Sequence, residues 1–145
     1  MLCMIVDSRI KPDHITPSSK GANSIDLRAC IPDSIRIRPG EEVVIEAGIK
    51  VAIPEATMGM IIPRSGKGVN GLVIGNLVGN IDPDYRGVVK VCLWNRGIKD
   101  HIIEPLERIA QLIVVNCYAP ANWTLTHSLD ATERGLGSFG STGRS

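Results

Sequence analysis

The sequence predicts an all-β fold, a distorted jelly roll or β-barrel built from short strands. Two observations support this prediction. Isoleucine and valine occur 19 and 12 times, against 10 leucines and 9 alanines, and this bias favours strands over helices. Fifteen glycines and nine prolines cut the 145 residues into short segments, which is typical of many strands joined by turns.

The predicted strands follow one another as short alternating or apolar segments, most of them bounded by glycine or proline. A polar loop separates the first two strands at 11–21. The apolar segment 71–79 has a glycine at every fourth position, and we interpret it as a hairpin. Segment 108–116 mixes helix formers with the strand signal LIVV, and we interpret it as a strand. The other predicted strands are 3–6, 24–28, 35–38, 42–46, 49–53, 58–62, 88–94, 102–104 and 123–125.

The domain organisation predicted from the sequence is a single domain, because 145 residues suit one hydrophobic core and no internal repeat is present. We expect residues 1–130 to form the barrel. The tail at 131–145 has four glycines and almost nothing to bury, so we expect it to be a mobile lid.

Charge and composition limit the classes of partner. A net charge of +1 and an aromatic content of 3% argue against general nucleic-acid or membrane binding. The cysteines at 3, 30, 92 and 117 form no C-x-x-C pair, and they predict reduced thiols in a cytoplasmic protein. No signal peptide or membrane span is expected, and the three histidines are scattered.

Segment 63–87 gathers arginine, lysine, serine and glycine, which are the groups that hold phosphates. Its aspartates offer a base or a metal contact. The residues alone leave two interpretations open, a glycine-rich pocket for a phosphate-bearing small molecule or a turn-rich β segment with solvated charges. A Walker A loop is excluded because Ile61 and Gly68 stand where that motif needs Gly and Ser or Thr.

Five short blocks follow one another in order along nearly the whole chain. They are NSIDLRA (23–29), PRSG (63–66), GNIDPDYRG (79–87), RIAQLI (108–113) and ERGLGSFGSTG (133–143). Together they are similar to the five motifs of the trimeric dUTPases, of the bacterial type. The resemblance implies a homotrimer of jelly rolls that hydrolyses dUTP to dUMP and pyrophosphate with Mg²⁺. It also implies three active sites between subunits, each closed by a tail exchanged from a neighbouring subunit.

Carried over residue by residue, the resemblance implies that Asp82 deprotonates the water that attacks the α-phosphorus. Arg134 of another subunit is expected to neutralise phosphate charge in the transition state. Tyr85 is expected to lie against the deoxyribose and exclude ribose. Asp26 is expected to reach Mg²⁺ through a water molecule.

Base recognition is expected from the side chain of Asn76 and the backbone of Leu77 to Gly79, which match the edge of uracil and leave no space for a 5-methyl group. Phe139, the single phenylalanine of the chain, is expected to stack over the base as part of the lid.

The phosphate chain is expected to be held by residues from three of the motifs. Lys67 contacts phosphate or is simply solvated, and Arg108 contacts phosphate or supports the neighbouring tail. A short helical turn is expected to begin at Ser65, where free N–H groups favour anions. The expected phosphate ligands are Arg64, Ser65, Gly66, Arg108 and Gln111, with Ser141 and Thr142 of the tail.

Three residues depart from the family pattern, which usually has Ala-Gly at Asn23-Ser24 and an apolar residue at Lys67. Two other functions share this fold. One is a dCTP deaminase, against which the GNIDPDYRG block argues. The other is a nucleotide-gated regulatory protein that binds a protein partner. The intact set of Asp82, Arg134 and Phe139 argues against a purely binding role and leaves a second role beside catalysis open.

Overall fold

The computed structural model describes residues 1–118 and 123–138. Within these residues the chain forms eleven short β-strands, one α-helix and one 3-10 helix, which confirms the prediction of an all-β fold. The elements are β1 (Leu2–Ile5), η1 (Pro12–Ile15), β2 (Ser24–Arg28), β3 (Ile35–Ile37), β4 (Glu42–Glu46), β5 (Ile49–Ala52), β6 (Thr57–Pro63), α1 (Ser65–Val69), β7 (Leu72–Ile74), β8 (Gly79–Ile81), β9 (Lys90–Asn95), β10 (His101–Ile103) and β11 (Arg108–Asn116).

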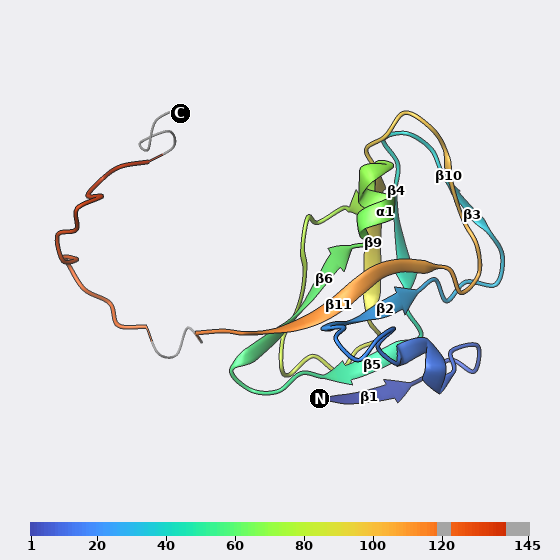
Figure 1. Ribbon diagram of the computed structural model, residues 1–145, viewed down its shortest axis with the longest axis horizontal. Helices are drawn as coiled ribbons and strands as arrows, with labels where there is room; N and C mark the ends of the chain where they lie inside the picture. Colours follow the sequence, from blue (N-terminus) through green and yellow to red (C-terminus); the bar gives the residue numbers. More distant parts are fainter. Residues whose placement is uncertain (119–122, 139–145) are drawn as a thin grey trace.

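The largest sheet has the order β2-β11-β6-β8, and all of its neighbouring strands are antiparallel (Figure 1). Alternation along β2 buries Ile25 and Leu27 against the core. Successive side chains of a strand point to opposite faces, so Asp26 lies on the outer face. Gln111 of β11 pairs with Asp26 in register and lies on the same outer face. The outer face of this sheet therefore carries two of the predicted site residues.

The other strands complete the barrel as a three-stranded sheet, β4-β9-β7, and two pairs, β1-β5 and β10-β3. Twenty-two apolar side chains are buried between these sheets, and twelve of them are isoleucines. No aromatic side chain is among the buried apolar residues of the described chain. The isoleucine and valine bias of the sequence is thus the composition of the core itself.

Asn95 is the one buried polar side chain among the described residues, and its hydrogen bonds are satisfied. Its Nδ2 donates to the carbonyl oxygens of Ile37 at 2.9 Å and Lys99 at 2.8 Å. Its Oδ1 accepts the N–H of Gly97 at 2.9 Å. These three bonds join β3, β9 and the loop after β9, so the polar group does not carry the usual cost of burial.

Most predicted strands are observed, and the bounds of β2, β4 and β11 coincide with the predicted ones. The predicted hairpin at 71–79 is wrong, because β7 pairs with β9 whereas β8 pairs with β6. The connection crosses from one sheet to the other. Leu77 adopts a φ of 64° in this crossing, and the N–H of Gly75 donates to the carbonyl oxygen of Cys92 at 2.9 Å.

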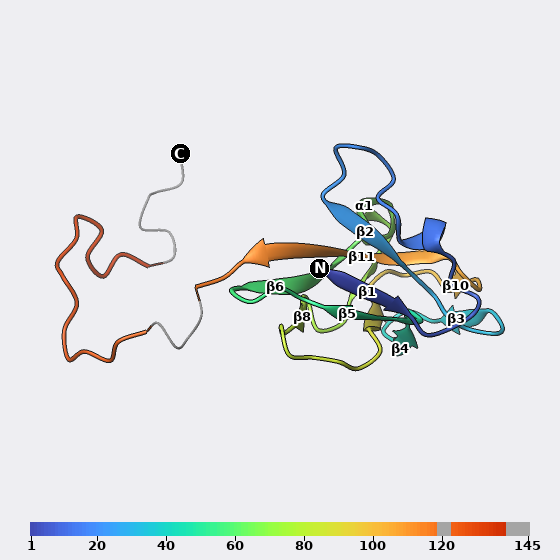
Figure 2. The same cartoon turned by 90° about the horizontal axis from the view of Figure 1, so that it is seen from below.

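Beyond β11 the chain leaves the barrel, and residues 123–138 lie apart from it in two perpendicular views (Figures 1 and 2). The predicted strand at 123–125 is wrong, because these residues pair with no strand among the described residues. Trp123 is 70% exposed and Leu125 is fully exposed. No helix among the described residues is long and apolar enough to cross a membrane.

A local ion pair fixes the segment after β1. The Asp7 carboxylate accepts hydrogen bonds from the backbone N–H of Arg9 at 2.9 Å and from its Nε and Nη2 at 3.0 and 2.8 Å. These bonds hold the pKa of Asp7 well below its usual range. All four cysteines are free, as expected, and burial raises the pKa of the Cys3 and Cys30 thiols.

Candidate active site

A half-buried carboxylate between two arginines lies on the outer face of the large sheet. The Asp26 side chain is only 14% exposed. Its Oδ1 accepts from Nε of Arg64 at 3.0 Å, and its Oδ2 accepts from Nη1 of Arg108 at 3.3 Å. Because both arginines are more exposed than the aspartate, each keeps donors that are open to a further anion.

The helical turn predicted at Ser65 is present as α1, directly after β6 ends at Pro63. Two glycines in its five residues make it a poor helix by propensity. Side chains hold it instead: Nδ2 of Asn70 donates to the carbonyl oxygen of Gly66 at 2.8 Å. The first N–H groups of a helix have no intrahelical acceptor, so Ser65 and Gly66 present donors at an exposed position.

Lys67 is not a solvated lysine, because its ammonium pairs with Oε1 of Glu107 and its side chain is only 18% exposed. The other oxygen of Glu107 accepts the backbone N–H of Glu104 at 2.9 Å. Lys67 therefore ties α1 to the turn between β10 and β11. Lys67, which departs from the apolar residue usual in the family, therefore has an ion-pair partner, Glu107, within the fold.

Gln111 is held by Ser24, which belongs to the Asn23-Ser24 departure from the family pattern. Its Nε2 donates to Oγ of Ser24 at 3.3 Å, across the β2-β11 pair. β2 begins at Ser24 and Asp26 follows two residues later on the same face, so the departure leaves the local backbone regular. Gln111, Asp26 and Arg64 thus form one continuous patch.

A second group of predicted residues surrounds a pocket of about 240 Å³. Asn76 lies in the crossing between β7 and β8, and its side-chain amide has no hydrogen-bond partner among the described residues. Gly79 fits tightly, because a Cβ there would lie 2.9 Å from Cβ of Ile61. The lining residues are Ile61, Asn76, Gly79, Asn80, Ile81, Tyr85, Val89 and Lys90.

Asp82 and Tyr85 follow β8 at the rim of this pocket. The Asp82 carboxylate is exposed, and its Oδ1 accepts from Nδ2 of Asn80 at 3.1 Å. The backbone carbonyl of Asp82 accepts the N–H of Tyr85 at 3.1 Å, which closes the turn. The Tyr85 hydroxyl donates to the carbonyl oxygen of Val88 at 2.9 Å. A Cβ at Gly87 would lie 2.3 Å from that hydroxyl, so the ring requires glycine there.

The two groups lie far apart within one chain. Gln111 pairs with both Asp26 and Ile62, and Ile81 pairs with Gly59. The strand register therefore fixes how far Asp82 lies from Asp26, both across and along the sheet. Asp82 lies three strand spacings across and four residues along the sheet from Asp26, about 14 Å and about 13 Å, or about 20 Å in total. No hydrogen bond or ion pair of the described residues joins the two groups.

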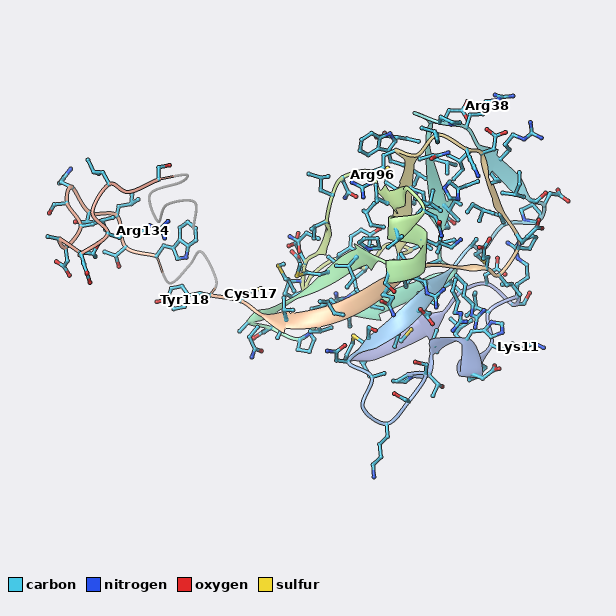
Figure 3. The ribbon with its side chains drawn as sticks, turned by 45° about the horizontal axis from the view of Figure 1, so that its top comes forward. Lys11, Arg38, Arg96, Cys117, Tyr118 and Arg134 are labelled. Atoms are coloured by element: carbon cyan, nitrogen blue, oxygen red, sulfur yellow. The ribbon has the colours of Figure 1, made fainter. Side chains whose placement is uncertain are left out.

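The predicted tail residue Arg134 does not approach either group. Figure 3 shows it in the detached segment, well beyond the point where Cys117 and Tyr118 leave the barrel. Its Nε donates to the carbonyl oxygen of Gly137 at 3.1 Å, within the tail itself. The other predicted tail residues, Phe139, Ser141 and Thr142, lie outside the described residues.

Four residues that shape these two groups were not predicted from the sequence. Asn80 stands two positions before Asp82 on a strand, and this same-face spacing is a signal that could have identified it. Lys90 begins the next strand and lines the pocket. Ser24 and Glu107 have no local signal, because their partners Gln111 and Lys67 are distant in sequence.

Comparison with known proteins places this geometry in a family. A family model described as dUTPase matches residues 11–143. A deoxyuridine 5'-triphosphate nucleotidohydrolase of Bordetella pertussis is 44% identical over 145 residues, covering 97% of this chain and 95% of that protein.

Solved structures share the fold. The dUTPase of Staphylococcus bacteriophage 80alpha with dUPNHPP matches at a TM-score of 0.85 and 24% identity, covering 99% of this chain and 98% of that one. A mutant dUTPase of phage phi11 of S. aureus, described as coordinating a structural Mg(II) ion, matches at 0.77 and 19% identity, covering 90% and 98%. The match of the family model over almost the whole chain and the 44% identity to a full-length relative establish that the chain belongs to the dUTPase family.

Proposed function

We propose that this protein is a dUTP diphosphatase, which hydrolyses dUTP to dUMP and pyrophosphate. Membership of the dUTPase family supports the proposal. The observation that carries it is the pocket of about 240 Å³ in which Asn76, Gly79 and Tyr85 meet. The exposed carboxylate of Asp82 is linked to the same pocket by Asn80. A nucleoside pocket next to a carboxylate is the arrangement that hydrolysis of a nucleotide requires.

The base is read by the unpartnered side-chain amide of Asn76 and by the backbone from Leu77 to Gly79. Uracil presents acceptor, donor and acceptor along one edge, whereas cytosine presents acceptor, acceptor and donor. A site matched to uracil leaves buried polar groups unpaired against cytosine, and this mismatch strongly disfavours dCTP. Phe139 of the tail stacks over the base and closes the pocket.

The sugar is selected by Tyr85, whose ring is fixed by the hydrogen bond from its hydroxyl to Val88. The deoxyribose packs against the ring face, and a ribose is rejected because its 2′-hydroxyl meets that face. The steric fit explains discrimination against UTP without any further polar group.

The triphosphate is bound by the patch that contains Arg64, Gln111 and the first N–H groups of α1 at Ser65 and Gly66. Arg64 and Arg108 supply charge-assisted donors, which are the strong partners of phosphate. From the tail, Arg134 neutralises charge in the transition state, and Ser141 and Thr142 donate to the γ-phosphate.

Hydrolysis starts with a water molecule that Asp82 orients. As the water oxygen attacks the α-phosphorus, its proton passes to the Asp82 carboxylate. The bond between the α-phosphorus and the oxygen bridging to the β-phosphate breaks, and pyrophosphate leaves. Arg134 stabilises the charge that develops on the phosphate oxygens.

Mg²⁺ is the proposed cofactor, and it would neutralise the charge of the phosphates. The described residues contain no group of three or more His, Cys, Asp or Glu side chains that could hold a metal. A single carboxylate such as Asp26 fits an ion held mainly by phosphate oxygens and water, which is the environment that Mg²⁺ prefers.

We also propose that the active enzyme is a homotrimer with tails exchanged between subunits. The separation of about 20 Å between Asp26 and Asp82 supports a site assembled from more than one copy. The detached segment 123–138 supports an exchange, because its large apolar side chains are exposed among the described residues of their own chain. In the cell, the enzyme would act in the cytoplasm, limit uracil in DNA and supply dUMP for dTMP synthesis.

Pyrophosphate release from dUTP, dCTP, dTTP and UTP, each with Mg²⁺ and with EDTA, tests the proposed function. We expect rapid release from dUTP alone and a large loss of rate in EDTA. Ammonia release from dCTP would identify a deaminase. Binding of dUTP without any hydrolysis would leave a nucleotide-gated regulatory protein as the function.

A further inference from the structure

Asn80 is the only side chain among the described residues that hydrogen-bonds the Asp82 carboxylate, and it also lines the nucleoside pocket. We propose that Asn80 is a positioning residue, which orients Asp82 for proton transfer from the attacking water. The proposal rests on the proposed dUTP hydrolysis and adds to it a role for Asn80, which lies within the block GNIDPDYRG but received no role from the family resemblance.

The contact between Asn80 and Asp82 follows from their places at the end of β8. β8 is the outermost strand of its sheet, and Asp82 follows its last residue. Side chains two residues apart on a strand point to the same face, so Asn80 and Asp82 are neighbours. Nδ2 of Asn80 donates to Oδ1 of Asp82 at 3.1 Å.

The hydrogen bond from Asn80 engages one of the two carboxylate oxygens of Asp82, and this decides which oxygen can accept a proton. A carboxylate has two equivalent oxygens and turns about its Cβ–Cγ bond when nothing holds it. The amide donor on Oδ1 fixes that rotation and leaves Oδ2 of Asp82 open to accept the proton of a water molecule. The backbone of Asp82 is held separately by the N–H of Tyr85 at 3.1 Å, so the side-chain contact is needed only for orientation.

An orienting contact affects turnover more than binding. Loss of a residue that orients a metal ligand typically lowers metal affinity or activity by about 10-fold to 100-fold, and we take the lower end of that range for a residue that orients a base. We therefore expect Asn80→Leu, which keeps the size but removes the donor, to lower kcat about 10-fold and to change KM less than about 2-fold. Asn80→Ser retains a short donor, and we expect it to recover part of the lost kcat.

The test measures kcat and KM for dUTP in the wild type, Asn80→Leu, Asn80→Ser, Asp82→Asn and the double variant of Asn80→Leu with Asp82→Asn. Asn116→Leu is the matched control, because it makes the same change at an exposed strand end outside both site groups. We expect the control to retain wild-type kinetics. Melting temperatures establish that each variant is folded, and Asn80→Ser serves if Asn80→Leu does not fold.

The double variant separates orientation from general structural support. If Asn80 acts through Asp82, adding Asn80→Leu to Asp82→Asn causes no further loss of kcat. The inference would be overturned if Asn80→Leu kept the wild-type kcat, or if it lowered kcat equally in the wild type and in Asp82→Asn. The Asp82→Asn variant would still test the proposed function in either case. A wild-type protein that releases no pyrophosphate from dUTP would overturn both.

Discussion

The barrel and the C-terminal tail use apolar side chains in opposite ways. In the barrel, isoleucine, valine and leucine are buried between sheets, and Leu112 is 2% exposed. In the segment 123–138, which lies apart from the barrel and includes the start of the tail, Leu125, Leu129 and Leu136 are all at least 89% exposed. The barrel thus has a core of its own, whereas the apolar side chains of the detached segment are exposed among the described residues. An exposed apolar segment of this kind favours the proposed exchange, in which another copy of the chain supplies the surface that covers it.

The largest effect is expected within the barrel, at Asp82. Asp82→Asn removes the proton acceptor but keeps the shape, so we expect kcat to fall by about 1000-fold with little change in dUTP binding. Single-turnover kinetics and dUTP titration measure the two quantities separately. A wild-type kcat would remove Asp82 from the mechanism.

Deleting residues 133–145 tests the tail as a functional but not a structural element. We expect activity to fall by about 100-fold because Arg134 and the lid residues are lost, a loss on the scale of one electrostatic donor. The barrel should keep its melting temperature and its oligomeric state, measured by light scattering after size exclusion. Unfolding of the truncated protein would mean that the tail supports the core and that the two regions are not independent.

A matched pair of leucine substitutions compares the two regions in stability. Leu112→Ala leaves a cavity in the core, and we expect the free energy of unfolding to fall by about 3 kcal/mol. Leu136→Ala changes a side chain that is fully exposed in its own chain, and we expect no change. Urea denaturation measures both. Equal destabilisation by the two substitutions would contradict the division between barrel and tail.

The smallest expected effect is a shift in melting temperature when the ion pair of Asp7 with Arg9 is removed. The pKa of Asp7 is lowered in the folded state, so the carboxylate stabilises the fold above the unfolded pKa of about 3.9 and loses this effect as pH falls below it. We expect Asp7→Asn to melt a few degrees below the wild type at pH 7, with the gap closing below about pH 4. Asp130→Asn in the tail is the control and should not shift the melting temperature at either pH.

Local patterns were enough to predict much of the barrel. Residues 24–28 alternate with the period of a half-buried strand, 42–46 contains three adjacent β-branched residues, and 108–116 contains the apolar run LIVV, and their bounds agree with the structure. The hairpin at 71–79 was wrong because adjacency in sequence does not decide which sheet a strand joins. The strand at 123–125 was wrong because an alternating segment forms a strand only where a partner is available.

The residues of the site were identified through family resemblance rather than from local chemistry. Register then brought Asp26 and Gln111 together, which no sequence period reveals. The partners of Lys67 and Gln111 escaped prediction because their contacts join segments tens of residues apart. Asn80 could have been recognised from its spacing to Asp82 alone.

The proposed trimer requires that one active site takes Asp82 and its tail from different chains. Two inactive variants test this requirement when they are unfolded, mixed and refolded together. One is Asp82→Asn with an intact tail, and the other lacks residues 133–145 but keeps Asp82. We predict recovery to about a quarter of the wild-type rate, because half of the chains supply Asp82 and half of their neighbours supply a tail. A mixture of confirmed mixed trimers that stays as inactive as its two components would contradict the account.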